Sequence, residues 1–258
     1  MIQALDRQLN VIWALTLRET RTRFGQYQLG YLWAFVEPIV WILSFYLIFA
    51  LVDRPSPRGM SLFGFLATGM ITYELFSKTA EKVSLAINVN RALLFYPQVR
   101  PLDLTFARWL LETATHCSVF VVIMASELMV TGQSLRISDP LSLLGGLLLA
   151  SALGYGVGLI FCMAQVIFPS LEKMRGPMMR PLFWTSGIFF TANSLPLEAR
   201  KILMYNPVVH AVEFVRQGWF TSYQAKWASL PYLLGWVLSL LFIGTLLERE
   251  IRRRIEVT

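Results

Sequence analysis

The chain carries few side chains that could do covalent or metal chemistry. Its two histidines, His116 and His210, have no second histidine or cysteine at the spacing of metal ligands. Its two cysteines, Cys117 and Cys162, fall inside long apolar stretches and indicate neither a disulfide framework nor a zinc site. We expect no catalytic or metal centre, and we interpret His116 as a hydrogen-bonding residue between helices.

The sequence also lacks a convincing nucleotide-binding loop. The closest approach to G-x-x-x-x-G-K-[ST] is GQYQLGY at residues 25–31, which has Tyr31 where a lysine must hold the phosphates. We therefore predict that the chain binds no cofactor. Any ATP and magnesium that drive it must bind to a separate ATPase chain.

Charged side chains inside apolar stretches are costly, which makes them candidates for function. The five examples are Glu37, Glu74, Arg108, Glu112 and Glu127. Glu37, Glu74 and Glu112 are expected near the cytoplasmic surface of the membrane. Glu127 is expected near the outer surface. This distribution favours contacts at helix ends or gates over a proton relay deep in the bilayer.

Aromatic residues are a second candidate group, because aromatic rings can stack on the apolar C–H faces of sugar rings. Trp41, Phe45 and Tyr46 follow an i, i+4, i+5 pattern that would place them on one stripe of a helix. With Trp184 and Phe189 they form a candidate substrate conduit. The alternative is that these residues belong to the aromatic belt of a membrane protein and face lipid.

Long apolar segments must position these side chains. Of the 258 residues, 55% are hydrophobic and 15% charged, and the mean hydropathy is +0.54. Soluble domains carry about 25% charged residues, and roughly 20 apolar residues suffice to cross a bilayer. We predict an all-α polytopic membrane protein with one domain over residues 1–258. Its six transmembrane helices are expected at 30–52, 61–77, 104–130, 141–168, 178–195 and 227–247.

Two further segments are amphipathic. Residues 1–29 alternate apolar and polar faces at helical spacing, which predicts an interface helix, or else a cytoplasmic helix packed on a soluble partner. Residues 196–225 are too polar to span and too apolar for a free loop. We expect re-entrant helices there, which enter the membrane and return to the same side.

Charge asymmetry predicts the orientation. Sixteen of the 23 Lys and Arg residues fall in the two termini and in the segments 78–108 and 173–180, which six spans would place on one side. Because basic residues are retained inside, this pattern puts both termini in the cytoplasm. The expected location is therefore a bacterial inner (cytoplasmic) membrane, crossed several times.

Two stretches go beyond composition. LRETRTRFGQYQLGYLWAFVEPIVW at 17–41 and YNPVVHAVEFVRQGWF at 205–220 resemble the permease subunits of capsular polysaccharide export ABC transporters, within the ABC-2 polysaccharide and polyol-phosphate exporter family. The resemblance implies a homodimer with two copies of an ABC ATPase, and export of a lipid-linked polysaccharide. It also implies a periplasmic co-polymerase and an outer-membrane polysaccharide channel as partners. No nucleic acid is implied.

The resemblance also suggests residue roles. A coupling helix that docks in the ATPase maps onto 86–98, with contacts from Asn90, Arg91, Phe95 and Tyr96. We expect a channel at the dimer interface, lined by the first and fifth spans. The cytoplasmic gate, where a phosphate of the lipid anchor would bind, comprises Arg18, Arg21, Arg23 and Glu37. The outer gate comprises Asn206, Pro207, His210, Glu213 and Arg216.

Three alternatives remain open from the sequence. An O-antigen or teichoic-acid exporter would have the same fold and carry a different polymer. A secondary transporter without an ATPase would need deep carboxylates and inverted repeats, and neither is visible. A membrane-embedded sugar-processing enzyme would need a carboxylate or histidine constellation, and none converges in the sequence.

Overall fold

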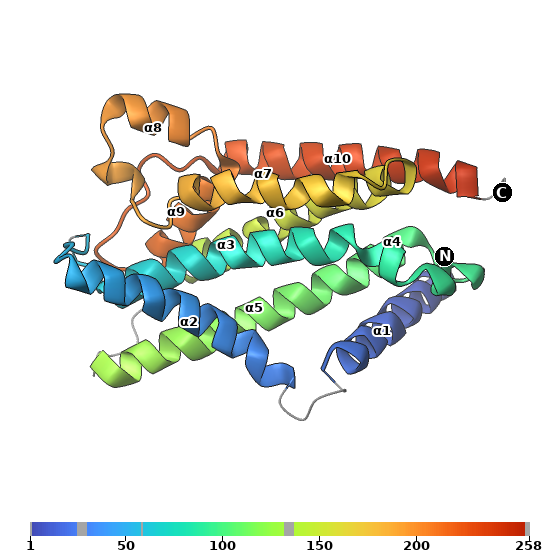
Figure 1. The fold of residues 1–258 in the computed structure, drawn as a ribbon, viewed down its shortest axis with the longest axis horizontal. Helices are drawn as coiled ribbons and strands as arrows, with labels where there is room; N and C mark the ends of the chain where they lie inside the picture. The colour runs from blue at the N-terminus through green and yellow to red at the C-terminus, as the bar shows by residue number, and fades with distance from the viewer. Residues whose placement is uncertain (1, 25–29, 58, 132–136, 256–258) are drawn as a thin grey trace.

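The regular structure of the chain is entirely helical in the part that the structure describes. The computed structural model describes residues 2–24, 30–57, 59–131 and 137–255 (Figure 1). Its elements, in chain order, are α1 (Ile2–Phe24), α2 (Gly30–Leu51), α3 (Leu62–Ser84), α4 (Ala86–Val89), the 3-10 helix η1 (Arg91–Phe95), α5 (Pro101–Thr131), α6 (Pro140–Ile167), α7 (Leu171–Thr185), the 3-10 helix η2 (Ala192–Ser194), α8 (Leu197–Leu203), α9 (Pro207–Trp219) and α10 (Leu230–Ile255).

Four of these helices are long and apolar enough to cross a membrane. The four segments are Leu32–Leu51, Pro101–Met129, Pro140–Ile167 and Leu230–Ile251. They confirm an all-helical protein with several candidate spans, and they coincide with the first, third, fourth and sixth predicted spans. The second and fifth spans, at 61–77 and 178–195, are not among the four, so a total of six spans remains a prediction.

The structure shows why these two segments differ from the rest. Helix α3 begins where the second span was predicted but continues through charged residues to Ser84. Helix α7 begins earlier than predicted, in the basic segment, and ends at Thr185, so residues 186–191 leave the helix. Pro177 and Pro181 lie inside α7 and remove two backbone donors from its hydrogen-bond ladder.

Helix α3 is the centre of the bundle, packed between α2, α5, α6 and α9. Small residues in α6, in the run GYGVG at 154–158, allow close approach of its neighbours. A Cβ atom on Gly154 would lie 2.4 Å from the carbonyl oxygen of Phe76 in α3. On the opposite side, a Cβ atom on Gly156 would lie 2.7 Å from Leu240 Cβ in α10. The run therefore holds α6 tightly between α3 and α10.

Polar caps begin two of the buried helices. The Ser61 hydroxyl accepts a hydrogen bond from Gly64 N (3.1 Å) at the start of α3. The Asp139 carboxylate accepts one from Leu141 N (3.0 Å) and another from the Ser142 hydroxyl (2.5 Å) at the start of α6. Hydrogen bonds from the Ser142 side chain and from backbone N–H groups lower the pKa of Asp139.

Most of the helices run along the long axis of the molecule, and different elements lie at its two ends. The start of α1, the end of α10 and the short helix α4 gather at the right end in Figure 1, whereas α8 lies at the left end. Helix α1 packs on α5. The segment predicted as a coupling helix, 86–98, consists of α4 and η1. The segment predicted as re-entrant, 196–225, consists of α8, α9 and the loop that follows.

Candidate functional site

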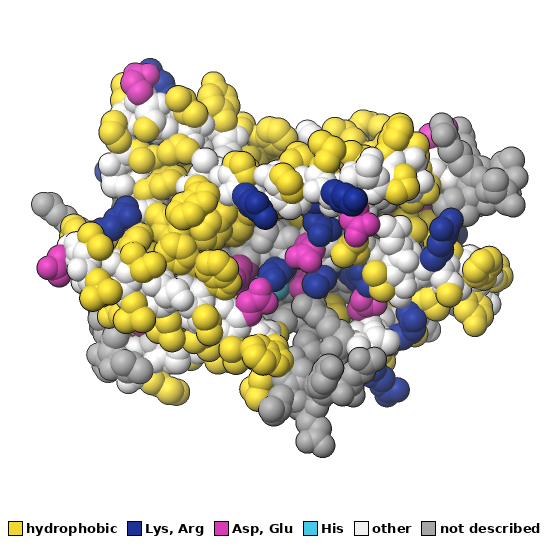
Figure 2. Space-filling model, in the orientation of Figure 1, with side chains coloured by type: hydrophobic (Ala, Val, Ile, Leu, Met, Phe, Trp, Pro, Cys, Tyr) yellow, Lys and Arg dark blue, Asp and Glu magenta, His cyan; other side chains and the backbone are white. Residues whose placement is uncertain are grey.

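A groove of about 410 Å³ lies between α2, α3 and α7. We call it the α2–α7 groove. In Figure 2 charged side chains gather at the middle of this face, and hydrophobic side chains cover the area to their left. The lining residues are Glu37, Trp41, Met70, Tyr73, Glu74, Ser77, Lys78, Glu81, Arg175, Gly176, Met179, Arg180 and Phe183. The groove therefore joins a charged part to an aromatic part.

Charges of both signs line the first part. The Lys78 ammonium donates to the Glu37 carboxylate at 2.6 Å, across from α3 to α2. Burial lowers the pKa of Lys78, but the hydrogen bond and the charge of Glu37 outweigh it, so that the pKa is raised. On α7, Arg175 donates to the Glu81 carbonyl oxygen (3.3 Å) and to the Ser84 hydroxyl, while Arg180 is exposed.

The aromatic part is a cluster of five rings, which we call the aromatic cluster. Trp41 and Phe45 stack with centroids 6.1 Å apart, as expected for helical neighbours four residues apart. Phe189 lies 4.8 Å from Phe45 and 5.3 Å from Trp184, and Phe183 contacts all four of the other rings. The structure thus brings together four of the five predicted conduit residues, from α2, α7 and the segment after α7.

The fifth predicted residue points elsewhere, and two others were missed. Tyr46 packs against Phe63 with centroids 6.2 Å apart, away from the cluster. Tyr46 lies five residues after Trp41, which in an α-helix corresponds to a rotation of about 140° around the axis. Its side chain therefore points to a different side of α2 from that of Trp41. Phe183 is the fifth ring of the cluster, and Tyr73 packs at its edge with its centroid 5.3 Å from that of Phe183. Tyr73 also donates its hydroxyl to the Met179 carbonyl oxygen (2.7 Å), which ties α3 to α7.

Trp41 and Trp184 leave large parts of their rings accessible, with 49% and 60% of each residue exposed. Phe189, at 8%, lies behind them. Exposed flat rings next to exposed charges can bind an amphiphilic chain, because the ring faces take apolar surface and the charges take polar groups. The arrangement suits the passage or binding of a polymer and holds no obvious arrangement of nucleophile and base among the described residues.

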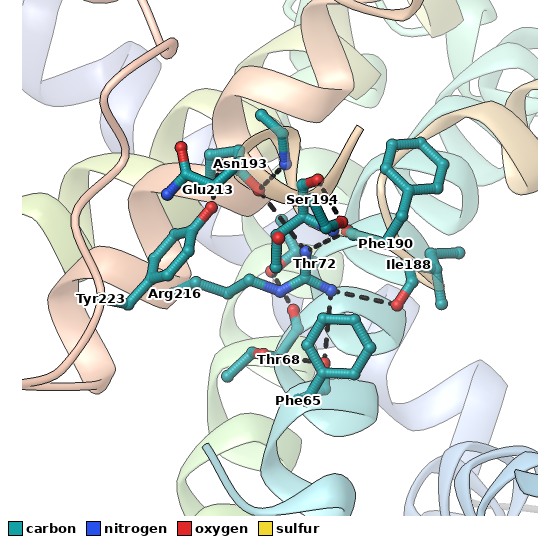
Figure 3. A network of polar contacts seen from close by, with 12 residues as sticks. Phe65, Thr68, Thr72, Ile188, Phe190, Asn193, Ser194, Glu213, Arg216 and Tyr223 are labelled. Carbon is teal, nitrogen blue, oxygen red and sulfur yellow. Dashed lines mark hydrogen bonds and ion pairs between the residues drawn. The ribbon is translucent and has the colours of Figure 1, made fainter. Parts of the chain in front are cut away.

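A buried polar network centred on Arg216 holds the backbone on either side of Phe189 (Figure 3). Arg216 is 0% exposed and donates to the carbonyl oxygens of Phe190 (2.8 Å), Ile188 (3.0 Å) and Phe65 (3.4 Å). Its guanidinium also lies 4.2 Å from the Phe65 ring centroid and 3.6 Å from Glu213. Arg216 therefore ties α9 to α3 and to the segment that carries Phe189.

Glu213 completes this network. Its carboxylate accepts hydrogen bonds from the Tyr223 hydroxyl and from Ala192 N (3.3 Å). A buried ion pair is stabilising only when further hydrogen bonds satisfy its remaining atoms. Here both carboxylate oxygens of Glu213 and both terminal nitrogens of Arg216 have hydrogen-bond partners, whereas Arg216 Nε has none among the described residues. The predicted outer-gate residues Glu213 and Arg216 thus lie inside the protein and act on the conduit segment through its backbone.

The other three predicted outer-gate residues fix the start of α9. Asn206 caps the helix by accepting from Val208 N (3.0 Å), and it donates to the hydroxyls of Thr185 and Ser186 at 3.2 Å. Pro207 occupies the first turn, where its missing N–H is tolerated. His210 accepts from Ser229 N at Nδ1 (2.9 Å), so Nε2 carries the proton donated to the Met204 carbonyl oxygen (2.9 Å).

The residues predicted at the cytoplasmic gate separate into different places. The Arg18 guanidinium donates to the Asn90 side chain at 2.8 Å, and Arg21 is exposed on α1. The side chain of Arg23 lies outside the described residues. Glu37 lies in the α2–α7 groove, paired with Lys78. The structure therefore does not join Arg18 and Glu37 in one site.

The predicted coupling residues also divide into two groups. Asn90 is buried and points inward, where it accepts from Arg18 and donates to the Ala86 carbonyl oxygen (3.3 Å). Next to it, Glu19 of α1 pairs with Arg108 of α5 at 2.7 Å. Arg91, Phe95 and Tyr96 are exposed and available to a partner. Sequence reasoning missed the link that Asn90 makes to α1.

No group of three or more metal-ligating side chains exists among the described residues. The Glu112 carbonyl oxygen accepts a hydrogen bond from His116 Nδ1 (3.0 Å) within α5.

Comparison with known proteins identifies the family. The chain matches the family described as ABC-2 type transporter over residues 10–220. It is 37% identical to the polysialic acid transport protein KpsM of Escherichia coli, over 92% of this chain and 91% of that protein. It is 30% identical to the capsule polysaccharide export inner-membrane protein CtrC of Neisseria meningitidis serogroup A, over 99% and 96%. The O-antigen export system permease protein RfbA of Klebsiella pneumoniae is 21% identical over 93% and 91%. The resemblance read from the sequence is thus confirmed, and the chain belongs to the ABC-2 type transporter family.

Proposed function

We propose that this chain is the membrane-spanning subunit of an ATP-driven exporter that moves lipid-linked capsular polysaccharide from the cytoplasm to the periplasm. The observation that carries the proposal is the similarity to capsule exporters over nearly the full chain. The O-antigen permease is more distant, which favours the capsule over the O-antigen alternative. As in the named relative CtrC, the membrane would be the bacterial inner membrane.

The α2–α7 groove is the proposed path of the polymer. Trp41 and Trp184 would stack on the apolar faces of successive sugar rings, a contact that does not depend on the identity of each sugar. The charged part would bind hydroxyl, carboxylate or phosphate groups. Arg18 is engaged by Asn90, so we extend the proposed anionic contact from Arg18, Arg21 and Arg23 to Arg180, which is exposed in the groove.

The channel is proposed to form between two copies of the chain. Helix α2 supports this, because only 11% of its span is buried within one copy although it carries part of the groove. A second copy facing it would close the groove into a passage. The proposed topology keeps six spans, with both termini in the cytoplasm, and it agrees with the start of α1 and the end of α10 lying at the same end of the bundle (Figure 1).

ATP would be hydrolysed on a separate ATPase, present in two copies. Phe95, 87% exposed, and Tyr96 are the proposed contacts of this partner, together with Arg91. Asn90 would pass the movement of the coupling segment to α1 through Arg18. A periplasmic co-polymerase and an outer-membrane channel complete the proposed set of partners.

The test is deletion of this chain in its encapsulated host, followed by complementation. We expect the deletion strain to accumulate lipid-linked polymer inside the cell and to lose the surface capsule. Complementation with Trp184→Ala or Arg180→Gln should restore less capsule than wild type, while the ATPase still co-purifies. Leu238→Ala, on the exposed side of α10, is the matched control and should restore it fully.

Transport that continues without any ATPase would refute the exporter and support a secondary transporter. Accumulation of O-antigen in place of capsular polymer would support the alternative substrate.

A further inference from the structure

A second groove lies on the other side of the bundle, between α5 and α6. Its volume is about 370 Å³, and its lining is hydrophobic, including Val121, Met124, Leu144, Leu147 and Trp219. We call it the α5–α6 groove. Both helices are candidate membrane spans, so the groove lies at the depth of the bilayer hydrocarbon.

A polar pocket of about 420 Å³ is lined by residues next to those of the groove along the chain. Its lining includes Ser138, Asp139, Gln217, Gln224 and Lys226. The two hollows share one stretch of chain: residues 137 and 140 line the groove, and residues 138 and 139 line the pocket. The boundary between them is therefore a single turn at the beginning of α6.

A backbone contact fixes this boundary. Asp139 N donates to the Gly218 carbonyl oxygen at 3.0 Å, which joins the start of α6 to the end of α9. A Cβ atom on Gly218 would lie 2.4 Å from Leu143 N, so only glycine allows the two helices to approach this closely. These contacts between the start of α6 and the end of α9 fix the position of the groove lining relative to the pocket lining.

The pocket lies at a membrane surface. The connection from α5 to α6 joins two candidate spans, and the exposed Trp227 follows Lys226 just before α10. Tryptophan is enriched at this depth in membrane proteins. Asp139 and the exposed Lys226 supply one negative and one positive charge to the same pocket.

We propose that the α5–α6 groove and the polar pocket together bind one zwitterionic phospholipid with a primary ammonium headgroup. An acyl chain lies between α5 and α6, the phosphate faces Lys226, and the ammonium faces Asp139. The charges of the pocket complement this headgroup, and the apolar groove begins where the headgroup ends. This site requires only that α5 and α6 span the bilayer, and it does not depend on the identity of the exported polymer.

The test uses the full chain in complex with its ATPase, purified in detergent and examined by native mass spectrometry. Val121→Trp and Leu144→Trp fill the groove from its rim, and Leu238→Trp places the same ring on the exposed face of α10 as a control. We expect wild type and the control to retain one phosphatidylethanolamine. The two groove variants should retain it about tenfold less, which corresponds to about 1.4 kcal/mol.

The headgroup is tested with Lys226→Gln and Asp139→Asn, because asparagine still caps α6. Each should weaken retention of phosphatidylethanolamine, and wild type should prefer it over phosphatidylglycerol, which lacks the ammonium. Equal retention in the groove variants and the control would overturn the site. Equal retention of the two lipids would overturn the assigned headgroup. Efficient disulfide formation between two copies through Leu144→Cys would show that a second copy covers this face, and would also overturn the proposal.

Discussion

Replacing Arg216 by methionine tests whether the buried network holds the conduit segment. Methionine is unbranched and smaller than arginine, and it removes every donor of the guanidinium. The Phe65 carbonyl oxygen keeps a hydrogen bond from the Thr68 hydroxyl (3.1 Å), so the loss falls mainly on Ile188 and Phe190. Each buried acceptor left without its donor costs about 1–3 kcal/mol.

Glu213 adds to this loss, because its carboxylate would stay buried without the neighbouring charge. Removing one partner of a buried ion pair costs about 3–5 kcal/mol, which includes the unmet hydrogen bonds. At about 2–4 °C per kcal/mol for a chain of this size, we expect the melting temperature to fall by about 10 °C. The second variant, Arg216→Met with Glu213→Gln, should recover part of this loss, because glutamine is neutral. Its amide oxygen accepts from Ala192 N in place of the carboxylate, and its NH2 group donates to the Tyr223 hydroxyl oxygen.

The assay follows a thiol-reactive dye on heating. Cys162 is 1% exposed and reacts only on unfolding, and a Cys117→Ala background removes the half-buried second thiol. Arg180→Met, at an exposed arginine, is the control and should melt like wild type. If Arg216→Met also melts like wild type, the network does not stabilise the fold. If the double variant melts below the single one, the buried charge of Glu213 is not the source of the loss.

Three further predictions follow from packing and exposure. Gly154→Ala should destabilise the protein by about 1–3 kcal/mol through overpacking, whereas Gly145→Ala, which has no atom within 4 Å of the added Cβ, should be neutral in the same melting assay. Trp184→Ala should leave the melting temperature unchanged, because the ring is largely exposed, but should lower the rate of capsule appearance after induction. Arg18→Gln and Asn90→Ala should each weaken co-purification of the ATPase, and a double-mutant cycle should give a coupling of about 0.5–1 kcal/mol; additive effects would contradict the link between them.

Much of the fold follows from the sequence because long apolar runs have one solution in a bilayer. The fourth predicted span, 141–168, differs from α6 by one residue at each end. The fifth span could not be placed in the same way, because α7 mixes basic residues with two prolines. There the helix follows local contacts with α3, such as that from Tyr73 to Met179, and not the hydropathy of the segment.

The site was predictable only where its residues share one helix. Trp41 and Phe45 are four residues apart, so their stacking follows from helical geometry. Phe189 joins them because the chain turns after α7 at Gly187, whose φ of 81° favours glycine. The contacts of Arg216 reach back 151 residues to Phe65, and no local pattern reports such a distance. Arg216 was predicted as a site residue through the family resemblance of residues 205–220, which gave no information on its contacts.

The long reach of Arg216 also has a consequence for biogenesis. During synthesis, α3 enters the membrane well before α9 exists, and the carbonyl groups of Ile188 and Phe190 precede Arg216 by 28 and 26 residues. In hydrocarbon, carbonyl groups without donors are costly. The hydrogen bonds that join α9 to α3 and to residues 188–190 can therefore form only after the ribosome has released α9. A nascent chain arrested before residue 216 should remain sensitive to proteases, and the same chain extended past it should become resistant.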